Sequence, residues 1–290
     1  MDLRRTSRAP TGVARRWQAA RRGRAERRFH TTLRFDPKAA PLLLSPHWDD
    51  AVLDCWALLG SPGDLAVVNV FAGTPVPGRL TRWDRVTGAV DSSVRTRERA
   101  TEDAEALAQV GRGAVNLPLL DAEYRAPGPS PSLRDIDQAL TANVPATSRV
   151  YAPAGLGNNT DHELVRWYAR VLARRGIPVS LYADLPYCVV HGWPHWVDGS
   201  EPDSHRDVDA FWRTFLLDVP ELEELRNART ERLDDERAAA KLAAMRTYRT
   251  QFSSLDGGTA GILSNAAIHR FEVMWDLDAT APPDRERKRR

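Results

Sequence analysis

Two short polar clusters in this sequence contain the residue types of a hydrolytic metal site. Residues 47–50 (His-Trp-Asp-Asp) follow the leucine run 42–44, and residues 159–162 (Asn-Thr-Asp-His) follow the apolar run 149–154. Each cluster stands where a predicted buried strand ends and a helix begins. Two imidazoles and one carboxylate form the protein ligand set of a catalytic zinc site, which keeps a fourth position open for water.

The elements that must position these clusters alternate along the chain. Apolar runs, rich in valine or leucine, predict five buried strands, and amphipathic stretches between and after them predict helices. The strands are expected near residues 42–44, 64–73, 114–120, 149–154 and 178–187. The helices are expected near residues 51–59, 92–110, 132–143, 161–175, 209–231 and 234–250.

This order predicts an α/β protein, a Rossmann-like three-layer sandwich with a mostly parallel sheet. Residues 267–277 are expected to add a C-terminal edge strand, and the aromatic stretch from residue 188 to 231 an insertion over the site. Because the carboxyl ends of parallel strands share one rim, both polar clusters should meet there. The loop at residues 75–90 should shape the same rim.

Other functions of this fold class lack their sequence signals. No G-x-G-x-x-G fingerprint follows the first strand, and no G-x-x-x-x-G-K-[ST] phosphate loop is present. A different interpretation of the first cluster stays open, because an Asp pair at a helix start commonly caps the helix and compensates its dipole.

Composition predicts a cytoplasmic protein with a basic arm. The 290 residues include 42% hydrophobic ones, but no run reaches the roughly 18 apolar residues of a membrane span. The two cysteines, Cys55 and Cys188, have no disulfide or metal pattern. Residues 1–35 are expected to form a disordered basic arm that could touch an anionic surface or nucleic acid, and residues 279–290 a basic tail. The catalytic domain is then residues 36–278.

Several motifs resemble those of the PIG-L/LmbE-like zinc-dependent de-N-acetylases. Residues 45–51 (SPHWDDA) are similar to the S-P-H-P-D-D-E signature and its SPHxDDA bacterial branch. Residues 160–162 (TDH) resemble the end of the H-P-D-H motif, and residues 182–187 (YADLPY) a Y-E-D-L-P-Y strand. Arg99 and Glu102, followed by Val110-Gly111, resemble the family's R-x-x-E helix, and Asp121 stands at the position of its post-strand Asp. Lys241 and residues 248–251 (YRTQ) resemble its K…Y-x-S-Q helix.

The resemblance implies a role for each motif residue. The metal ligands would be His47, Asp50 and His162, binding Zn²⁺ or another divalent ion such as Fe²⁺. Asp49 would be the general base, and Asp161 would support the site through hydrogen bonds. Weaker candidates for substrate contacts are Arg99 and Asp121 and, on the insertion, Trp193 and His195.

One position departs from the motif in a way that bears on the chemistry. Asn159 stands where H-P-D-H has its first His, a residue implied in handling the tetrahedral intermediate or the leaving amine. An amide can donate a hydrogen bond to an oxyanion but cannot shuttle a proton at neutral pH. His191 and His195 are possible replacements for the proton donor.

These observations predict a metal-dependent hydrolase that removes an N-acetyl group from an amino-sugar-type or glycoconjugate substrate. The alternatives are hydrolysis of another amide, such as a thiol conjugate or a secondary-metabolite intermediate, and a catalytically weak glycan-binding protein. The identity of the sugar and the oligomeric state are left open.

Overall fold

The computed structural model describes residues 29–277, apart from residues 127, 129, 158, 202–204, 218, 220, 221, 223–227 and 260. The basic stretch 1–28 and the tail 279–290 lie outside the described residues. In the described part, no helix has the length and apolarity needed to cross a membrane.

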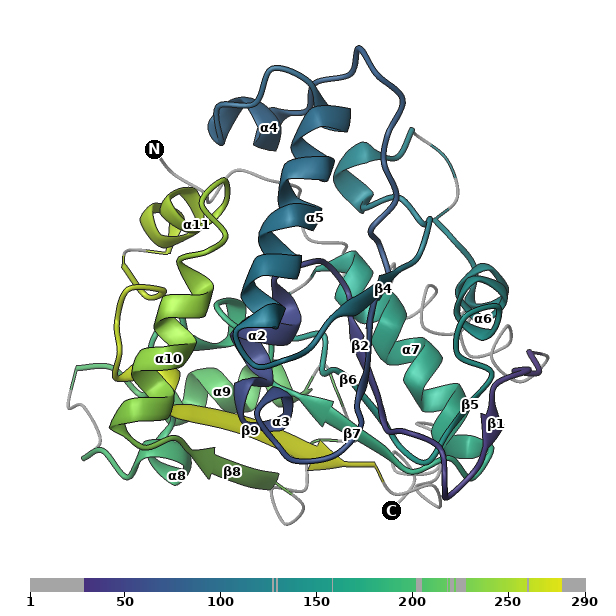
Figure 1. The fold of residues 1–290 in the computed structure, drawn as a ribbon. Coiled ribbons are helices and arrows are strands. Elements are labelled where there is room, and N and C mark those ends of the chain that lie inside the picture. The colour runs from purple at the N-terminus through teal and green to yellow at the C-terminus, as the bar shows by residue number, and fades with distance from the viewer. Residues whose placement is uncertain are drawn as a thin grey trace.

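A seven-stranded sheet with the order β4-β3-β2-β6-β7-β9-β8 forms the centre of the molecule (Figure 1). The first five strands in that order are parallel, and β9 and β8 are antiparallel to their neighbours. The strands are β2 (Leu42–Ser45), β3 (Ala66–Asn69), β4 (Ala114–Asn116), β6 (Val150–Pro153), β7 (Val179–Tyr182), β8 (Ala228–Arg232) and β9 (Phe271–Asp276). The predicted α/β sandwich with a mostly parallel sheet is confirmed.

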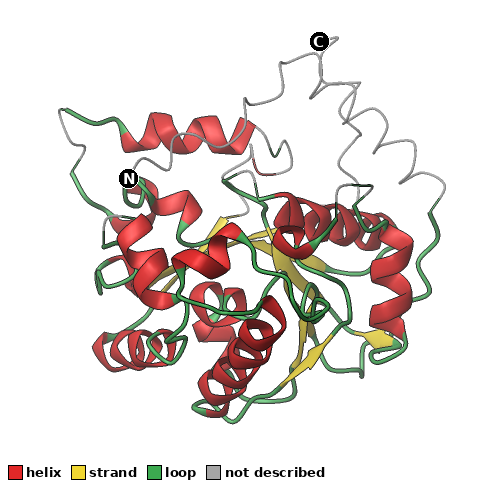
Figure 2. Ribbon diagram, turned by 90° about the horizontal axis from the view of Figure 1, so that it is seen from above, coloured by secondary structure: helices red, strands yellow, loops and turns green. Residues whose placement is uncertain are grey.

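Helices cover both faces of this sheet (Figure 2). They are α2 (Asp50–Asp54), α3 (Trp56–Leu59), α4 (Arg82–Val86), α5 (Ser92–Ala108), α6 (Leu133–Thr141), α7 (Thr160–Arg174), α8 (His195–Asp198), α9 (Val208–Leu217), α10 (Asp235–Met245) and α11 (Phe252–Gly258). Helix α7 packs on β6 and β7 and against α6, while α2 packs on β2 and against α10. The leucines of β2 are fully buried between these layers, as their continuous apolar run predicts.

The prediction for the C-terminal third is partly wrong. The expected helix 209–231 ends with α9, and residues 228–232 instead form the edge strand β8. The predicted edge strand exists as β9, but it lies inside the sheet between β7 and β8. Strand β8 is polar and largely exposed, so its sequence has no alternation of apolar and polar residues that would predict a strand. Its extended conformation is stabilised by backbone pairing with β9.

The predicted helix 51–59 is divided at Cys55 into α2 and α3. The carboxylate of Glu272 on β9 accepts the backbone N–H groups of Trp56 at 2.8 Å and Ala57 at 3.0 Å, and so begins a new helix. Glu272 is buried and pairs with the buried Lys241 of α10 at 2.7 Å. A side chain more than 200 residues away therefore sets the break.

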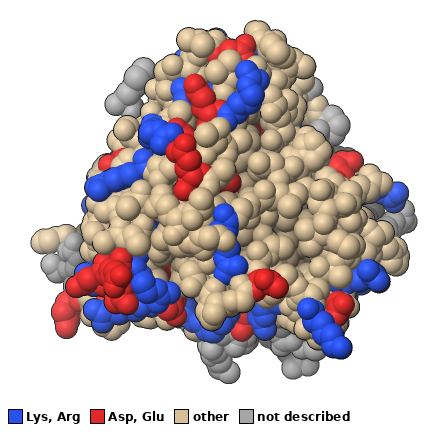
Figure 3. Space-filling view, viewed as in Figure 1, with Lys and Arg blue, Asp and Glu red and all other residues tan. Residues whose placement is uncertain are grey.

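The folded domain also begins earlier than expected. Phe29 and Leu33 are buried, and β1 (Arg34–Phe35) pairs with β5 (Ala146–Thr147). Thr32 donates to the Asp137 carboxylate through its backbone N–H at 2.9 Å and its hydroxyl at 2.8 Å. Residues 29–35 thus pack on the domain instead of belonging to the arm. On the face in Figure 3, acidic and basic side chains of the described residues are interspersed.

Candidate metal centre

The turn after β2 is built by its own polar side chains. Ser45 Oγ donates to the His47 carbonyl oxygen at 2.6 Å and accepts the Ala51 N–H at 3.0 Å. The His47 N–H donates to Asp50 Oδ2 at 2.8 Å. These bonds close the turn tightly and place Asp49 and Asp50 at the start of α2.

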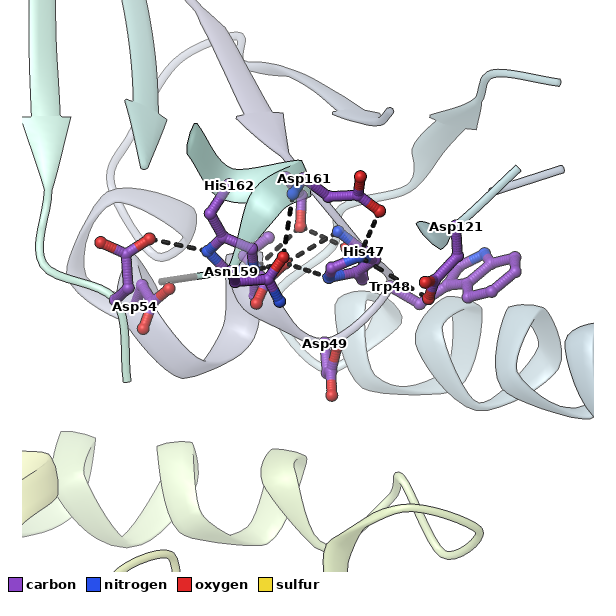
Figure 4. A network of polar contacts seen from close by, with 12 residues as sticks. His47, Trp48, Asp49, Asp54, Asp121, Asn159, Asp161 and His162 are labelled. Atoms are coloured by element: carbon purple, nitrogen blue, oxygen red, sulfur yellow. Dashed lines mark hydrogen bonds and ion pairs between the residues drawn. The ribbon is translucent and has the colours of Figure 1, made fainter. Parts of the chain in front are cut away.

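Asp49 stands at the N-cap position of α2, but its side chain makes no capping hydrogen bond. Its carboxylate projects to one side of the cluster, away from the imidazoles (Figure 4). The capping interpretation of the Asp pair is therefore not what the structure shows for Asp49, and the carboxylate is available for chemistry.

The second cluster forms the first turn of α7. Asn159 is the N-cap, and its Oδ1 accepts the Asp161 N–H at 3.0 Å. His162 is fully buried, and its Nδ1 lies 2.7 Å from Asp184 Oδ1, just after β7. The second oxygen of Asp184 accepts the Leu156 N–H at 2.9 Å, so the carboxylate is held on both sides. This contact fixes the His162 ring and directs Nε2 toward the first cluster.

The two clusters converge on one point, as predicted. Single ligand atoms of His47, Asp50 and His162 lie within 4.8 Å of one another. Asp50 Oδ2 is 3.3 Å from His47 Nδ1 and 3.4 Å from His162 Nε2. His162 Nε2 is buried and has no hydrogen-bond partner among the described residues. A buried nitrogen lone pair facing a carboxylate and a second imidazole fits a divalent cation with nitrogen and oxygen ligands.

The protonation of the histidines is coupled to the charges of the neighbouring carboxylates. Burial disfavours imidazolium at His162, but the nearby Asp50 and Asp184 carboxylates outweigh it and raise its pKa to about 10. Burial would raise the pKa of Asp50, but the two histidines outweigh this and hold it well below its usual range. A cation must therefore displace protons from the imidazoles, which makes its binding stronger as pH rises.

Asp49 is buried and lies beside a positively charged side chain. Its side chain is 12% exposed, and Arg99 of α5 lies 3.6 Å away. Burial and the neighbouring Asp50 raise the pKa of Asp49, with Arg99 opposing the shift. Arg99 also reaches Asp121 at 3.8 Å, and Asp121 lies 3.6 Å from His47 Nε2. The structure thus brings both of these weaker candidates, Arg99 and Asp121, to the cluster.

Asp161 lies behind His47. It is 1% exposed, and its Oδ2 is 3.4 Å from His47 Nε2 and accepts the Ala122 N–H at 2.8 Å. Its other oxygen pairs with Arg125. Asp161 is therefore held between His47 on one side and Arg125, which the sequence did not predict, on the other.

Three residues of the insertion lie in other surroundings. Trp193 is 3% exposed, stacks on Trp212 at 5.5 Å between ring centroids, and donates its indole N–H to the Ile268 carbonyl at 2.8 Å. The structure thus places the Trp193 indole in the hydrophobic core. His195 is exposed and its Nδ1 lies 2.5 Å from the Ser200 carbonyl oxygen, while His191 packs edge-on to Phe211.

Sequence reasoning missed Asp184, Arg125 and Tyr187 as parts of the site. Asp184 follows β7 as His47 follows β2, so the rule that found the first cluster could have found it. Arg125 follows a short turn of 3-10 helix and has no local signal. Tyr187 contacts Asn159 by a side-chain hydrogen bond and lies edge-on to His162 at 5.7 Å. Gly157 permits this approach, because a Cβ there would lie 2.3 Å from the Tyr187 Cβ.

Comparisons with known proteins bear on this site. No family model matches the chain. Over 162 residues it is 32% identical to the 2'-N-acetylparomamine deacetylase of Streptomyces fradiae, a match that spans 50% of this chain and 57% of that enzyme. The chain thus aligns with little more than half the length of this curated relative.

Solved structures share the fold over most of the chain. A teicoplanin deacetylase in its zinc-inhibited form superposes with a TM-score of 0.60 and 21% identity, covering 82% of this chain and 98% of that one. The deacetylase of A40926 pseudoaglycone superposes with a TM-score of 0.58 and 25% identity, covering 84% and 100%. The resemblance to deacetylases that the motifs predict is thus confirmed by similarity in sequence and in fold.

Proposed function

Because the chain has the fold of the PIG-L/LmbE-like deacetylases and carries their motifs, we propose that it is a metal-dependent amidohydrolase. Its reaction is removal of an N-acetyl group from an amino-sugar-type substrate. The observation that carries the proposal is the convergence of His47, Asp50 and His162 within 4.8 Å, beside a carboxylate at Asp49 that caps no helix.

The ligand set fits Zn²⁺, with Fe²⁺ as an alternative, held by the two imidazoles and the Asp50 carboxylate. Such an ion supplies Lewis acidity toward the amide carbonyl and lowers the pKa of a water molecule. Asp184 keeps His162 in the tautomer that offers Nε2 to the ion.

Asp49 is the proposed general base. Its raised pKa, caused mainly by burial, makes it a better proton acceptor than an ordinary aspartate. Arg99, 3.6 Å away, keeps the carboxylate ionised in part and orients it. In this proposal the proton that Asp49 accepts from water passes to the leaving amine, so Asn159 is not required to shuttle one.

Asn159 has a different proposed role. Since its Oδ1 is used in capping α7, its Nδ2 is the end that can donate. The partner of the Asn159 side chain is Tyr187, so the two side chains form a polar pair beside His162. We assign this pair to hydrogen bonding of the substrate carbonyl or a sugar hydroxyl.

We infer the substrate class from the names of the similar proteins. Those proteins are named as deacetylases of 2'-N-acetylparomamine, of teicoplanin and of the antimicrobial reagent A40926 pseudoaglycone. We therefore place the substrate of this chain among N-acetylated amino sugars, either free or within a larger glycoconjugate.

The test is turnover of N-acetylated amino sugars by protein depleted of metal and then reloaded with Zn²⁺ or Fe²⁺. Mass loss of one acetyl group marks deacetylation, and any other fragment marks a different amide. Asp49→Asn should keep its metal and lose about 10²–10⁴-fold in kcat. A matched control is Asp276→Asn, a half-exposed carboxylate on β9. Absence of a stoichiometric divalent ion, or full activity of Asp49→Asn, would contradict the proposal.

A further inference from the structure

Arg125 stands out because it meets Asp161, a carboxylate that almost no solvent reaches. Asp161 is 1% exposed and lies against His47 Nε2 at 3.4 Å. Its remaining donors are the Ala122 N–H at 2.8 Å and the Arg125 guanidinium. Arg125 is the only permanently charged side chain recorded in contact with Asp161 among the described residues.

A buried carboxylate needs such a partner. An ionised group that loses its water is costly to bury unless it is paired and hydrogen-bonded. Residue 159, which begins the same helix turn, contributes only a neutral amide, and that amide accepts a hydrogen bond from the Asp161 backbone. Asp161 therefore has two partners of positive or donor character, the His47 ring and Arg125, and the permanently charged one is a loop residue outside the motif.

Arg125 is itself fixed in place. Its guanidinium carbon lies 5.3 Å from the centroid of the Phe71 ring, and the His47 ring packs on the same phenyl group at 6.3 Å between centroids. Phe71 is fully buried and lies two residues after β3. The ring therefore holds the guanidinium and the imidazole in one arrangement, with Asp161 joining them.

This arrangement determines which nitrogen of His47 is free for a metal. Asp161 and Asp121 face Nε2, so Nδ1 faces Asp50 and the convergence point. Turning the ring would exchange the two nitrogens and break the ligand set. Asp161 contacts His47 through Oδ2, which also accepts the Ala122 N–H, and Arg125 holds the opposite oxygen, Oδ1, of the same carboxylate.

We infer that Arg125 is a positioning residue for the metal centre: by holding the Asp161 carboxylate against His47 Nε2, it presents His47 Nδ1 as a metal ligand. The inference rests on the proposed metal-dependent function. Arg125 acts through Asp161 and His47 and is not itself one of the proposed metal ligands or proton-transfer groups.

The test compares Arg125→Met and Arg125→Lys with wild type. Arg149→Met is the matched control, because Arg149 is an arginine that pairs with a half-exposed carboxylate, Asp276, at 3.1 Å. Zn²⁺ affinity of the apo protein is measured by competition with a chelator, and kcat and KM are measured at saturating Zn²⁺. Folding is checked by circular dichroism and thermal unfolding.

Arg125→Met should bind Zn²⁺ about 10–100-fold more weakly, which is the usual effect of losing a group that orients a metal ligand. Its kcat should fall with little change in KM. Added guanidinium ion should restore part of the Zn²⁺ affinity of Arg125→Met. The affinity of Arg125→Lys should lie between those of wild type and Arg125→Met, because an ammonium group keeps the charge without the planar fork of donors. Arg149→Met should match wild type in every measurement.

Two outcomes would overturn the inference. One is a Zn²⁺ affinity of Arg125→Met within twofold of wild type. The other is a loss that guanidinium does not relieve and that accompanies a lowered unfolding temperature, which would make Arg125 a structural residue only. Failure of wild type itself to bind metal or to hydrolyse an acetamide would instead refute the proposed function.

Discussion

Replacing Asp184 by asparagine is expected to weaken metal binding while leaving the fold intact. Asp184 is fully buried, and its two oxygens serve two donors, His162 Nδ1 at 2.7 Å and the Leu156 N–H at 2.9 Å. An amide of the same shape keeps one acceptor oxygen, so its NH2 group faces one of these donors without a bond. The charge that favours a metal-bound imidazole is lost as well.

The magnitude follows from this geometry. Loss of a carboxylate behind a metal-ligating histidine typically costs 10–100-fold in metal affinity. At about 1.4 kcal/mol per tenfold change, this is about 1.4–2.8 kcal/mol of binding free energy. The unfolding free energy of the apo protein should also fall by roughly 1–3 kcal/mol, because one buried donor is left unsatisfied.

The assay is Zn²⁺ competition with a chelator of known affinity, run beside denaturant unfolding of the apo protein. Asp276→Asn on β9 is the matched control, because its carboxylate is half-exposed and pairs with surface arginines. A Zn²⁺ affinity of Asp184→Asn within twofold of wild type, in a protein that remains folded, would refute the role of Asp184 in orienting His162.

Two further predictions concern pH and the aromatic insertion. The raised pKa of His162, about 10, means that its protonated form stabilises the apo protein fully below pH 6.5 and that this stability is lost as pH rises toward 10. The unfolding free energy of the apo protein should therefore fall over this range while stabilisation by added Zn²⁺ grows, and pH-independent apo stability would contradict the assignment. Trp193→Ala should cost about 3–5 kcal/mol of unfolding free energy, because it removes a buried indole, yet leave KM within twofold. Val190→Ala, at a half-exposed neighbouring site, is its control, and a large KM change with little loss of stability would return Trp193 to the substrate site.

The candidate site was predictable where its residues follow local rules. His47, Asp50 and His162 each stand just after an apolar strand or in the first turn of a helix, and parallel strands bring such positions to one rim. Asp184 obeys the same rule after β7 and was overlooked. Arg125 obeys no such rule, because an arginine in a loop can face solvent or a carboxylate with equal ease, and only the packing of Phe71 decides between them.

The same division holds for the fold. Buried parallel strands and most amphipathic helices carry their own period, and their central residues were predicted, whereas the helix expected at residues 209–231 extends only to Leu217. Strand β8 and the break at Cys55 depend on partners distant in sequence, on β9 and on the Glu272 carboxylate. Trp193 shows the same limit, since an aromatic residue on an irregular segment can be either surface or core until its neighbour Trp212 is placed.

By itself, the amino-acid sequence determined the sheet type, the rim at which the polar clusters meet and the residue types of the candidate metal centre. These follow from hydrophobic period and from strand-end position, both of which are local properties of the chain. Only the tertiary structure decided which carboxylate supports each histidine, which cation balances Asp161, and that Asp49 caps no helix. Those depend on side chains that meet across long sequence separations, where direction and burial are set by packing.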